Sequence, residues 1–587
     1  MTISQDPNSA QIAHEAALET TSRLIAALVN EGLVAVTVED LKDVSYLVLK
    51  CHSKLINDST RILVSLREGT RYELWTPAAG ITIAAEDCVS AISPELNQAD
   101  IVGNIIIQHL SGREEVVYRP DEVFDVVSPW ICDNKKVVAQ VRAELQSSAD
   151  NQEKWLHYAL SHPAPTIGAP LIEWEQGLIR GHLTHAMHRT FYAIPPVKPV
   201  QIDNIENFLN PEIIIISVPR DCVQLNGPFE ASLKPLLIEL NISAASTDRV
   251  LLPCYAEQLH VIRHSLGNDV EVVTSKNENV KLHGQRQSSI RSASISGFPF
   301  HVKMSLSYVI GGSKRSLPSW VTESCIEVSQ LLHEIATDPE IMSDTNLLWI
   351  ARKVAAISSP DADLSVMLRE DHEQRARELG QCLVLPATLF EVGGEDRVAH
   401  VVNLFGLDTL DKCKNWFREY TRVLLKAVIP PLLSGVGLEA HMQNTLLRFE
   451  VGSNIPCGFV YRDMAGLRLH VPTLARRGVT LKPVSGALLT NDIDVVRVNV
   501  YHNIVASHLG WALQAMGLAW NGGWDIVREE MVDALTNTPR YKAEAAELLR
   551  FMLQPLGKRK AFFRMKLAGG ISGQRVYFCV PNPLVAP

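Results

Sequence analysis

The sequence predicts a multidomain α+β protein, and three observations support this fold class. The chain has 587 residues, more than a single hydrophobic core usually organises, so several domains are expected. Its residues are 46% hydrophobic and 20% charged, which is typical of folded globular chains. Helical, strand-like and again helical patterns follow one another along the sequence, which favours helices and sheets concentrated in different regions.

The first part of the chain is interpreted as a mixed α/β module. Residues from about 10 to 35 place apolar side chains at helical spacing and end near Gly32, which predicts an amphipathic opening helix. Alternating stretches follow up to about residue 150. A Pro- and Gly-rich transition over residues 163–185 precedes the strand-like pieces "PEIIIISVP", "VEVVTS" and "HVKMSLSYVIGG". The middle of the chain is therefore expected to be mostly antiparallel sheet.

From about residue 345 the pattern is interpreted as helical. Helices are predicted over residues 346–359, 372–390 and 408–435, the last of which ends at two prolines and Gly435. The next stretch, residues 438–471, is predicted to contain two strands joined by a turn. Either strand or helix spacing would keep Glu439 and Gln443 close together.

Charge and cysteine content exclude several classes of protein. The net charge is −10, from 55 basic and 65 acidic residues, and no long basic run occurs, so nucleic acid is not an expected partner. The ten cysteines are scattered singly, which indicates thiols of a reducing compartment. The first residues lack the pattern of a secretion signal, and the longest apolar run is too short for a bilayer. We expect a cytoplasmic protein with no membrane partner.

A first cluster of polar residues follows the long predicted helix. Carboxylate and amide oxygens are the ligands that hard cations prefer, and Mg²⁺ usually takes one or two protein carboxylates, with water and phosphates completing its shell. Four residues supply such oxygens: Glu439, Gln443, Asn444 and Asp463. His441 lies among them and is able to donate to a phosphate or a carboxylate. The alternative is a polar seam whose members satisfy one another within a hairpin. For the whole set a ligand site is favoured, because unpaired polar groups among apolar neighbours cost roughly several kcal/mol.

A second cluster lies upstream, in strand-like context between residues 284 and 318. It contains Ser289, Arg291, Lys303 and Arg315. Cations and hydroxyl groups at these spacings are suited to a polyphosphate, since arginine binds as a planar fork and lysine as a point charge. The alternative is a solvated basic edge strand, a common protection against aggregation.

A third cluster consists of His182, His185 and His188 in "GHLTHAMHRT". Three histidines suggest zinc at first sight, but a fourth ligand of the usual kind is missing. Packing or a surface position is the default interpretation of each histidine alone. Hydrogen bonding to a polycarboxylate is the better functional interpretation.

The order of these motifs resembles a known family. "GHLTHAMHRT", "SSIRS", "KMSLSYVIGGSKR", "LEAHMQN" and "YRDMAG" follow one another as in the NRPS-independent siderophore (NIS) synthetases, the aerobactin-synthetase (IucA/IucC-like) family. The likeness spans about residues 160 to 520. It implies an enzyme that uses ATP and Mg²⁺ to adenylate a carboxyl group of citrate or a related acid. An amine or hydroxyl group then displaces AMP, which gives an amide or ester in siderophore or other secondary metabolism.

The resemblance also implies an architecture and residue roles. The family fold is a cupped hand whose thumb, fingers and helix-rich palm correspond to residues 1–160, 161–385 and 386–587, and relatives are commonly homodimers. The residues implied to bind the phosphates and the acyl-adenylate are Ser289, Arg291, Lys303 and Arg315. Those implied to bind magnesium and the nucleotide are Glu439, Gln443, Asn444 and Asp463. His441 is assigned to phosphate or substrate, and His182 and Thr184 lie near the carboxylate substrate or the α-phosphate. Arg315, His441 and Lys303 are the expected catalytic residues.

The sequence departs from the family pattern at several positions. The family usually has prolines at Leu183 and Ala186, lysine at Arg189, arginine at Phe191, and His-Pro-Trp at residues 255–257, where this chain has Tyr-Ala-Glu. An arginine replaced by Phe191 removes a fork for carboxylate. This substitution predicts that the acid is less charged or larger than citrate.

Two other functions remain open from the sequence. "HMQNTLL" followed by "RD" also resembles small-molecule kinases, although an acidic base before the motif and an early Gly-rich loop are missing. The departures also allow a family member that has lost turnover and serves as a binding protein. Retention of Lys303, Arg315, His441 and Asp463 favours the enzyme, because a dead site has no need of buried charges.

Overall fold

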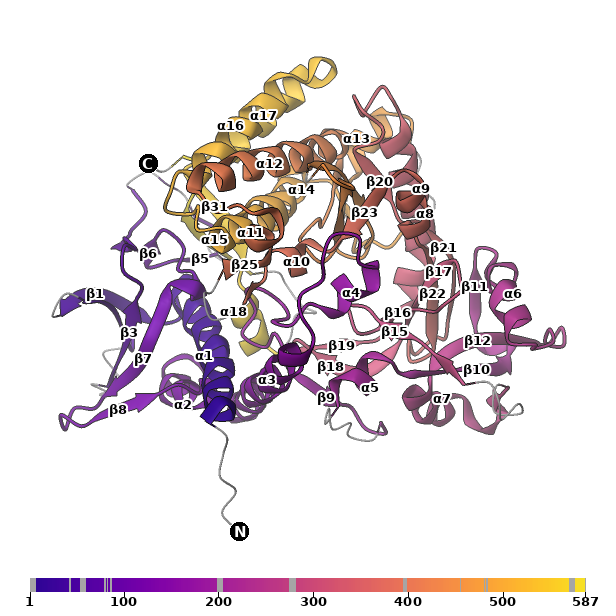
Figure 1. Ribbon diagram of the computed structural model, residues 1–587, viewed down its shortest axis with the longest axis horizontal. Coiled ribbons are helices and arrows are strands. Elements are labelled where there is room, and N and C mark those ends of the chain that lie inside the picture. Colours follow the sequence, from indigo (N-terminus) through magenta and orange to yellow (C-terminus); the bar gives the residue numbers. More distant parts are fainter. Residues whose placement is uncertain are drawn as a thin grey trace, which may run out of the picture.

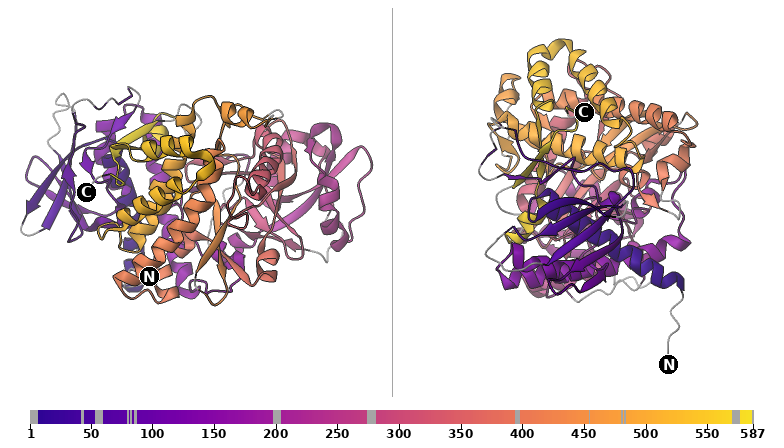
Figure 2. Two further views of the ribbon diagram at one scale, coloured as in Figure 1. Left: turned by 90° about the horizontal axis from the view of Figure 1, so that it is seen from above. Right: turned by 90° about the vertical axis from the view of Figure 1, so that its left-hand side faces the viewer.

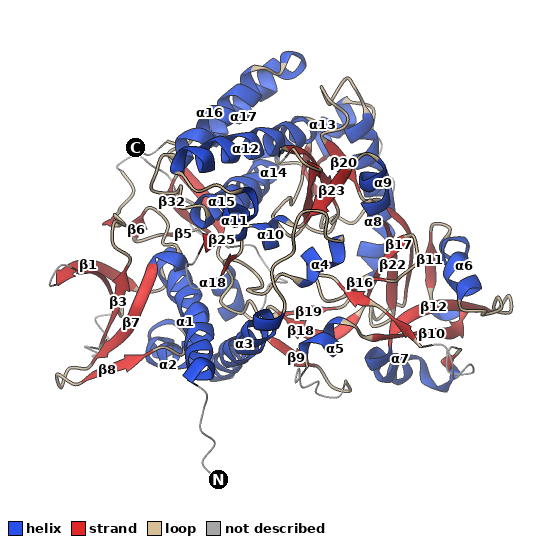
Figure 3. Ribbon diagram, in the orientation of Figure 1, coloured by secondary structure: helices blue, strands red, loops and turns tan. Residues whose placement is uncertain are grey.

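The computed structural model describes most of residues 7–585. The segments outside the description are 42–43, 53–59, 79–80, 82, 85–86, 198–203, 274–280, 394–397, 454, 480, 482–483 and 570–575. Helices and sheets concentrate in different regions, as the α+β prediction requires (Figure 3). Within the described part of the chain, no helix is long and apolar enough to cross a membrane.

The N-terminal region packs three helices and one antiparallel sheet around a single core (Figure 1). The predicted opening helix is α1, Pro7–Asn30, which buries Leu24, Ile25 and Leu28 completely on one face. It packs against α2 (Pro120–Ile131) and α3 (Lys135–Ser161). The sheet has the order β1-β2-β3-β7-β8. Its strands are Ala35–Leu41, Val44–Lys50, Arg61–Leu66, Ile101–Gln108 and Glu114–Val117.

The middle region is mostly antiparallel sheet, as predicted. A six-stranded sheet has the order β11-β21-β22-β17-β16-β15. Its strands are Gln224–Asn226, Lys353–Ser358, Ser365–Glu370, Phe300–Met304, Ser292–Ser294 and Gln285–Arg286. Beside it, β10 (Glu212–Pro219) pairs with β12 (Arg249–Tyr255). A smaller sheet joins β9, β18 and β19, which are Phe191–Ala193, Leu306–Ile310 and Ser313–Arg315.

The C-terminal region places helices over a further, four-stranded sheet. The predicted long helix is α12, Leu410–Leu433, and it packs against β28 of the sheet β20-β28-β27-β23. The strands are Leu348–Ile350, Pro456–Tyr461, Thr445–Glu450 and Gln381–Val384. Strands β27 and β28 form the hairpin that the sequence predicted. In Figure 1 the orange and yellow helices of this region, α12 among them, lie at the top of the molecule.

Two helix predictions in this region are wrong. Residues 346–359 form strands β20 and β21 instead of a helix. Residues 372–390 divide into α9 (Glu373–Glu378), strand β23 and α10 (Pro386–Leu389). Short apolar runs have the same pattern in a buried strand and a buried helix, and here the strands are buried on both faces. The periodicity of these residues did not distinguish strand from helix, and the packing around them in the folded protein favours strands.

The C-terminal end of the chain is built into the N-terminal region. Strand β32 (Tyr577–Pro581) pairs with β31 (Leu556–Lys560) and also with β5 (Cys88–Val89). Between β31 and β32 lies helix α18, Phe562–Leu567, whose first amide groups donate to the buried carboxylate of Glu31. The left view of Figure 2 shows the C mark over the N-terminal region.

Candidate active site

An ion pair between the buried Lys303 and the half-buried Asp463 joins the second and first predicted clusters. The ammonium group of Lys303, on the central strand β17, lies 2.8 Å from the carboxylate of Asp463, which follows β28. Burial alone would raise the pKa of Asp463, but Lys303 and Lys353 outweigh it and hold this pKa well below its usual value. The two motifs, 160 residues apart in sequence, therefore share one site.

The "SSIRS" motif forms a tight turn, so the prediction of strand context for Ser289 and Arg291 is wrong. The turn connects β15 to β16 and places Ile290 at a φ of 66°, a conformation that is rare for a β-branched residue. Arg291 donates to the carbonyl of Ser316 at 2.8 Å. In the same turn Ser288 receives a hydrogen bond from the side chain of Gln443 at 3.4 Å. The turn thus meets the "LEAHMQN" motif directly.

Arg315 ends strand β19 and completes the group of cations. Its Nε is buried and has no hydrogen-bond partner among the described residues. Burial first, and Arg291 second, lower its pKa to about 10. Burial also lowers the pKa of Lys303, which Asp463 partly restores and Arg291 lowers further. Arg291, Lys303 and Arg315 therefore converge, and their mutual repulsion favours an anion between them.

The segment that carries Glu439, His441 and Gln443 is a loop between β26 (Val436–Gly437) and β27, neither the strand nor the helix expected. Buried groups fix its path. His508 Nδ1 lies 2.8 Å from the carbonyl of Ala440, to which it donates. The side chain of Asn444 donates to the carbonyl of Glu439 at 3.0 Å, and the Glu439 amide donates to the hydroxyl of Tyr461 at 3.3 Å.

Glu439 faces a lysine that sequence reasoning missed. Lys560 Nζ, at the end of β31, lies 3.1 Å from Glu439 Oε1. Burial would raise the pKa of Glu439, but Lys560 and His441 lower it on balance. Gly466 lies against this carboxylate so closely that a side chain would collide with it. No local pattern marks Lys560, because only the pairing of β31 brings it here.

Glu439 and Asp463 are the two carboxylates that fit a magnesium ion. The charge of Asp463 raises the pKa of Glu439, which places the two carboxylates within electrostatic reach. Mg²⁺ bound with a nucleotide needs only one or two protein carboxylates, so this donor set fits. Among the described residues no group of three or more histidine, cysteine or acidic side chains suits a metal by itself.

A second polar network supports the cleft from behind. The guanidinium of Arg462 pairs with the buried Glu175 on α4, Leu171–Gln176, and Glu175 also accepts from Ser288 Oγ at 2.7 Å. Lys353 Nζ donates to the carbonyl of Arg462 at 2.5 Å. Sequence reasoning missed these residues, since a buried pair of distant residues leaves no local signal. The network fixes Arg462 beside Asp463.

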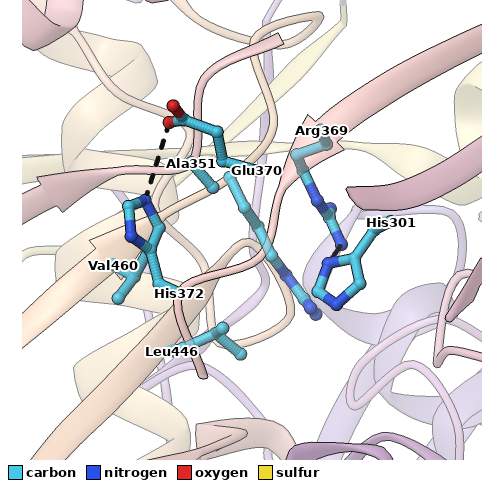
Figure 4. Close-up of a pocket in the computed structure, with 8 residues that line it drawn as sticks. His301, Ala351, Arg369, Glu370, His372, Leu446 and Val460 are labelled. Carbon is cyan, nitrogen blue, oxygen red and sulfur yellow. Dashed lines mark hydrogen bonds and ion pairs between the residues drawn. The ribbon is translucent and has the colours of Figure 1, made fainter. Parts of the chain in front are cut away.

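A small cavity of about 10 Å³ lies next to this network (Figure 4), roughly room for one water. Its lining includes His301, Arg369, Glu370 and His372. Arg369 lies 2.9 Å from His301 Nδ1 and donates to Gln287 at 2.6 Å. The cavity is therefore too small for a nucleotide or an acid and belongs to the support of the cleft.

The predicted histidine cluster divides in the structure. The ring centroids of His182 and His441 lie 6.5 Å apart, so the third motif reaches the first. Thr184 is exposed, and its amide donates to His182 Nδ1 at 3.4 Å. His188 turns away, with Nδ1 2.7 Å from the carbonyl of Arg180 and Nε2 3.1 Å from Thr20 Oγ1. The zinc interpretation of the three histidines therefore has no geometric support.

The departures from the family pattern lie in the interior. Phe191 stacks on Tyr308 with ring centroids 4.7 Å apart. Arg189 lies 3.9 Å above the ring of Trp155 and donates to the carbonyl of Ile179 at 3.1 Å. Glu257 pairs with the buried Arg286. These side chains are accommodated by packing, and the identity of the acid stays a prediction.

Comparison with known proteins agrees with these motifs. Residues 170–391 match the IucA / IucC family, and residues 414–574 match the ferric iron reductase FhuF-like transporter family. The second match lies entirely within the last third of the chain. It therefore describes a similarity of the C-terminal region.

Whole-length relatives extend the likeness to both ends. The petrobactin biosynthesis protein AsbB from Bacillus anthracis superposes with a TM-score of 0.75 at 14% identity, covering 98% of this chain and 96% of that one. ATP-bound aerobactin synthetase IucA from Klebsiella pneumoniae gives 0.71 at 14% identity, covering 97% and 100%. The NRPS-independent siderophore synthetase-like protein ankE of Aspergillus thermomutatus is 30% identical over 95% of this chain and 91% of its own length. The chain therefore belongs to the family of NRPS-independent siderophore synthetases.

Proposed function

We propose that the protein is an ATP-dependent synthetase that adenylates a carboxylic acid and condenses it with an amine or alcohol. The pair Lys303–Asp463 carries this proposal, because it joins the motif proposed to bind phosphate to the motif proposed to bind the metal. The family membership supports it, as does the bound ATP of the similarly folded aerobactin synthetase.

The chemistry requires two anions to meet. A carboxylate oxygen attacks the α-phosphorus of ATP, pyrophosphate leaves, and an acyl-adenylate forms. An amine or hydroxyl group then attacks the acyl carbon, AMP leaves, and the nucleophile loses a proton. Arg291, Lys303 and Arg315 cancel the repulsion in the first step, and His441 donates to the phosphate or to the acid. Ser289 and Asn444 complete the nucleotide site in this proposal.

Magnesium and architecture are parts of the same proposal. Mg²⁺ would be held by Glu439 and Asp463, with Gln443 and Asn444 nearby, and supplies positive charge next to the phosphates. Residues 1–160, 161–385 and 386–587 are proposed as thumb, fingers and palm of a cupped hand, in a homodimer. A cytoplasmic location is supported by the ten cysteines, all of which are free.

The test is a screen of carboxylic acids for ATP–pyrophosphate exchange, with hydroxylamine to trap the acyl-adenylate. Citrate and other polycarboxylates are expected to give the highest rates. This readout requires no knowledge of the acceptor. Amines and alcohols are screened afterwards with the best acid.

Two outcomes would contradict the proposal. Release of ADP instead of AMP and pyrophosphate would identify a kinase. Absence of exchange with every acid, together with retained ATP binding, would indicate a binding protein. Alanine at Arg315 or His441 is expected to abolish exchange, and unchanged exchange would remove that residue from the mechanism.

A further inference from the structure

Three histidines surround the aromatic ring of Phe562, and a fourth, His441, lies beside one of them, with its ring centroid 6.5 Å from that of His182. His182 and His185 precede β9, His441 precedes β27, and His502 lies in a π-helical segment, Tyr501–Leu509. The centroid of Phe562, the first residue of α18, lies 6.3 Å from that of His182, 5.6 Å from His185 and 5.8 Å from His502. Wide helical turns of this kind often occur at functional sites. We call this group the histidine pocket.

All four rings are held in the same tautomer. In each ring Nδ1 accepts a backbone amide hydrogen. The donors are Thr184 for His182 at 3.4 Å, Met187 for His185 at 3.0 Å, Gln443 for His441 at 3.2 Å and Lys560 for His502 at 3.4 Å. A ring nitrogen that accepts a hydrogen bond carries no proton, so each neutral ring carries its proton on Nε2. His188 differs, since its Nδ1 is the donor.

The Nε2–H groups have no partner among the described residues. That of His185 is buried and unpaired, which costs about 1–3 kcal/mol for a polar group without a hydrogen bond. His182 is exposed, His441 is half-buried and His502 is buried. Donors of this kind, gathered at one place, are complementary to oxygen acceptors of a ligand.

The lysines beside the histidine pocket are neutralised by acidic partners. Its two lysines are each paired, Lys560 with Glu439 at 3.1 Å and Lys566 with Glu144 at 2.7 Å. Burial lowers the pKa of His185 to about 4 and lowers that of His502 well below its usual value. The rings are therefore uncharged donors at neutral pH. The unpaired cation Arg315 lies close enough to lower the pKa of both His182 and His185, after burial and nearer groups.

We propose that His502, together with His182 and His441, binds the oxygen-bearing far end of the carboxylic acid above Phe562. The reacting carboxylate then lies toward Arg315 and Lys303. This inference rests on the proposed function and adds His502 and Phe562 to the acid site. It identifies the acid as one with a hydroxyl, carbonyl or second carboxyl group beyond the reacting carboxyl. An acid with only hydrocarbon there leaves the N–H groups unpaired and is rejected.

Two substitutions of His502 test the donor role. His502→Leu removes the donor. His502→Gln retains it, since a glutamine amide reaches about as far as imidazole Nε2. In ATP–pyrophosphate exchange with citrate, His502→Leu is expected to raise the KM for citrate about tenfold or more, with the KM for ATP within about twofold. His502→Gln is expected to restore most of the loss. His260→Leu, an exposed histidine on α7 (Leu259–Leu266), is the matched control.

A citrate KM within about twofold of the wild type in active His502→Leu would overturn the inference and leave the proposed function intact. If the wild type catalyses no exchange, the rise in Tm caused by citrate decides. If citrate raises the Tm of the wild type and does not raise that of His502→Leu, the proposed role of the histidine pocket is supported. An equal rise in both proteins, or no rise in the wild type, overturns it.

Discussion

The two sides of the proposed site, the cations around Asp463 and the histidine pocket, differ in their electrostatics. On one side Arg291, Lys303 and Arg315 gather positive charge around Asp463, and only part of that charge is paired. On the other side the histidine pocket presents N–H donors whose neighbouring lysines are neutralised. Charge is needed where an anionic carboxylate approaches an anionic phosphate. Neutral donors suffice where one acid is distinguished from another. An acid that lacks an acceptor leaves a buried N–H group unpaired, which costs free energy of binding.

The largest effect is expected from removing charge on the first side. Lys303→Met is expected to lower the exchange rate about 10³-fold, since it removes a cation from the reacting phosphate. It also removes the ion-pair partner of the half-buried Asp463, which lowers the free energy of unfolding by at most about 3–5 kcal/mol, the value for a fully buried pair. Exchange rate and Tm are measured together.

A double variant separates the two effects. Lys303→Met with Asp463→Asn is expected to recover Tm and not activity. Recovery of both would mean that Lys303 serves only stability. Lys314→Met is the control, because Lys314 lies close to Arg315 in sequence and pairs with Asp363 at the surface.

An intermediate effect on the exchange rate is expected from a substitution beside Glu439, which lies between the two sides of the site. In Gly466→Ala the new Cβ collides with the carboxylate of Glu439 and displaces this carboxylate from its present position. We expect exchange to fall roughly 10–100-fold, as small misplacements of positioning residues do. Gly486→Ala meets no neighbouring atom and is the matched control. Equal activity of the two variants would show that Glu439 is not required in its present position.

The smallest effect concerns the floor of the histidine pocket. Glu31 caps α18, and burial raises the pKa of its carboxyl to about 7. The folded state thus binds this proton more tightly than the unfolded state, so its contribution to stability is present below about pH 4.5 and is lost as pH rises toward 7. The loss is at most about 3 kcal/mol.

Glu31→Gln removes this titration. The Tm of the wild type minus that of Glu31→Gln is expected to fall between pH 5 and pH 8. Glu230→Gln, at an exposed pair with Arg220, is expected to show no such trend. A constant difference for Glu31→Gln would mean that Glu31 is ionised throughout this range.

Sequence predicted the motifs better than the elements that carry them. Lys303, Asp463 and Gln443 come together as expected, because their residue types already indicate shared chemistry. The turn at Ser289 was misassigned as strand. The strands over residues 346–359 were misassigned as helix, since short apolar runs do not distinguish buried strand from buried helix. Lys560 and His502 were not predicted. Each lies in an ordinary local pattern, and only strand pairing and helix packing bring them to the cleft.

The pairing of β32 with β5 has a consequence during protein synthesis. When a ribosome has made residues 1–555, every nucleotide-binding motif already exists. Lys560, Phe562 and the strand that joins the first and last parts of the molecule are still missing. We therefore expect nascent chains to acquire activity only after the final elements emerge, and prematurely terminated products to be inert.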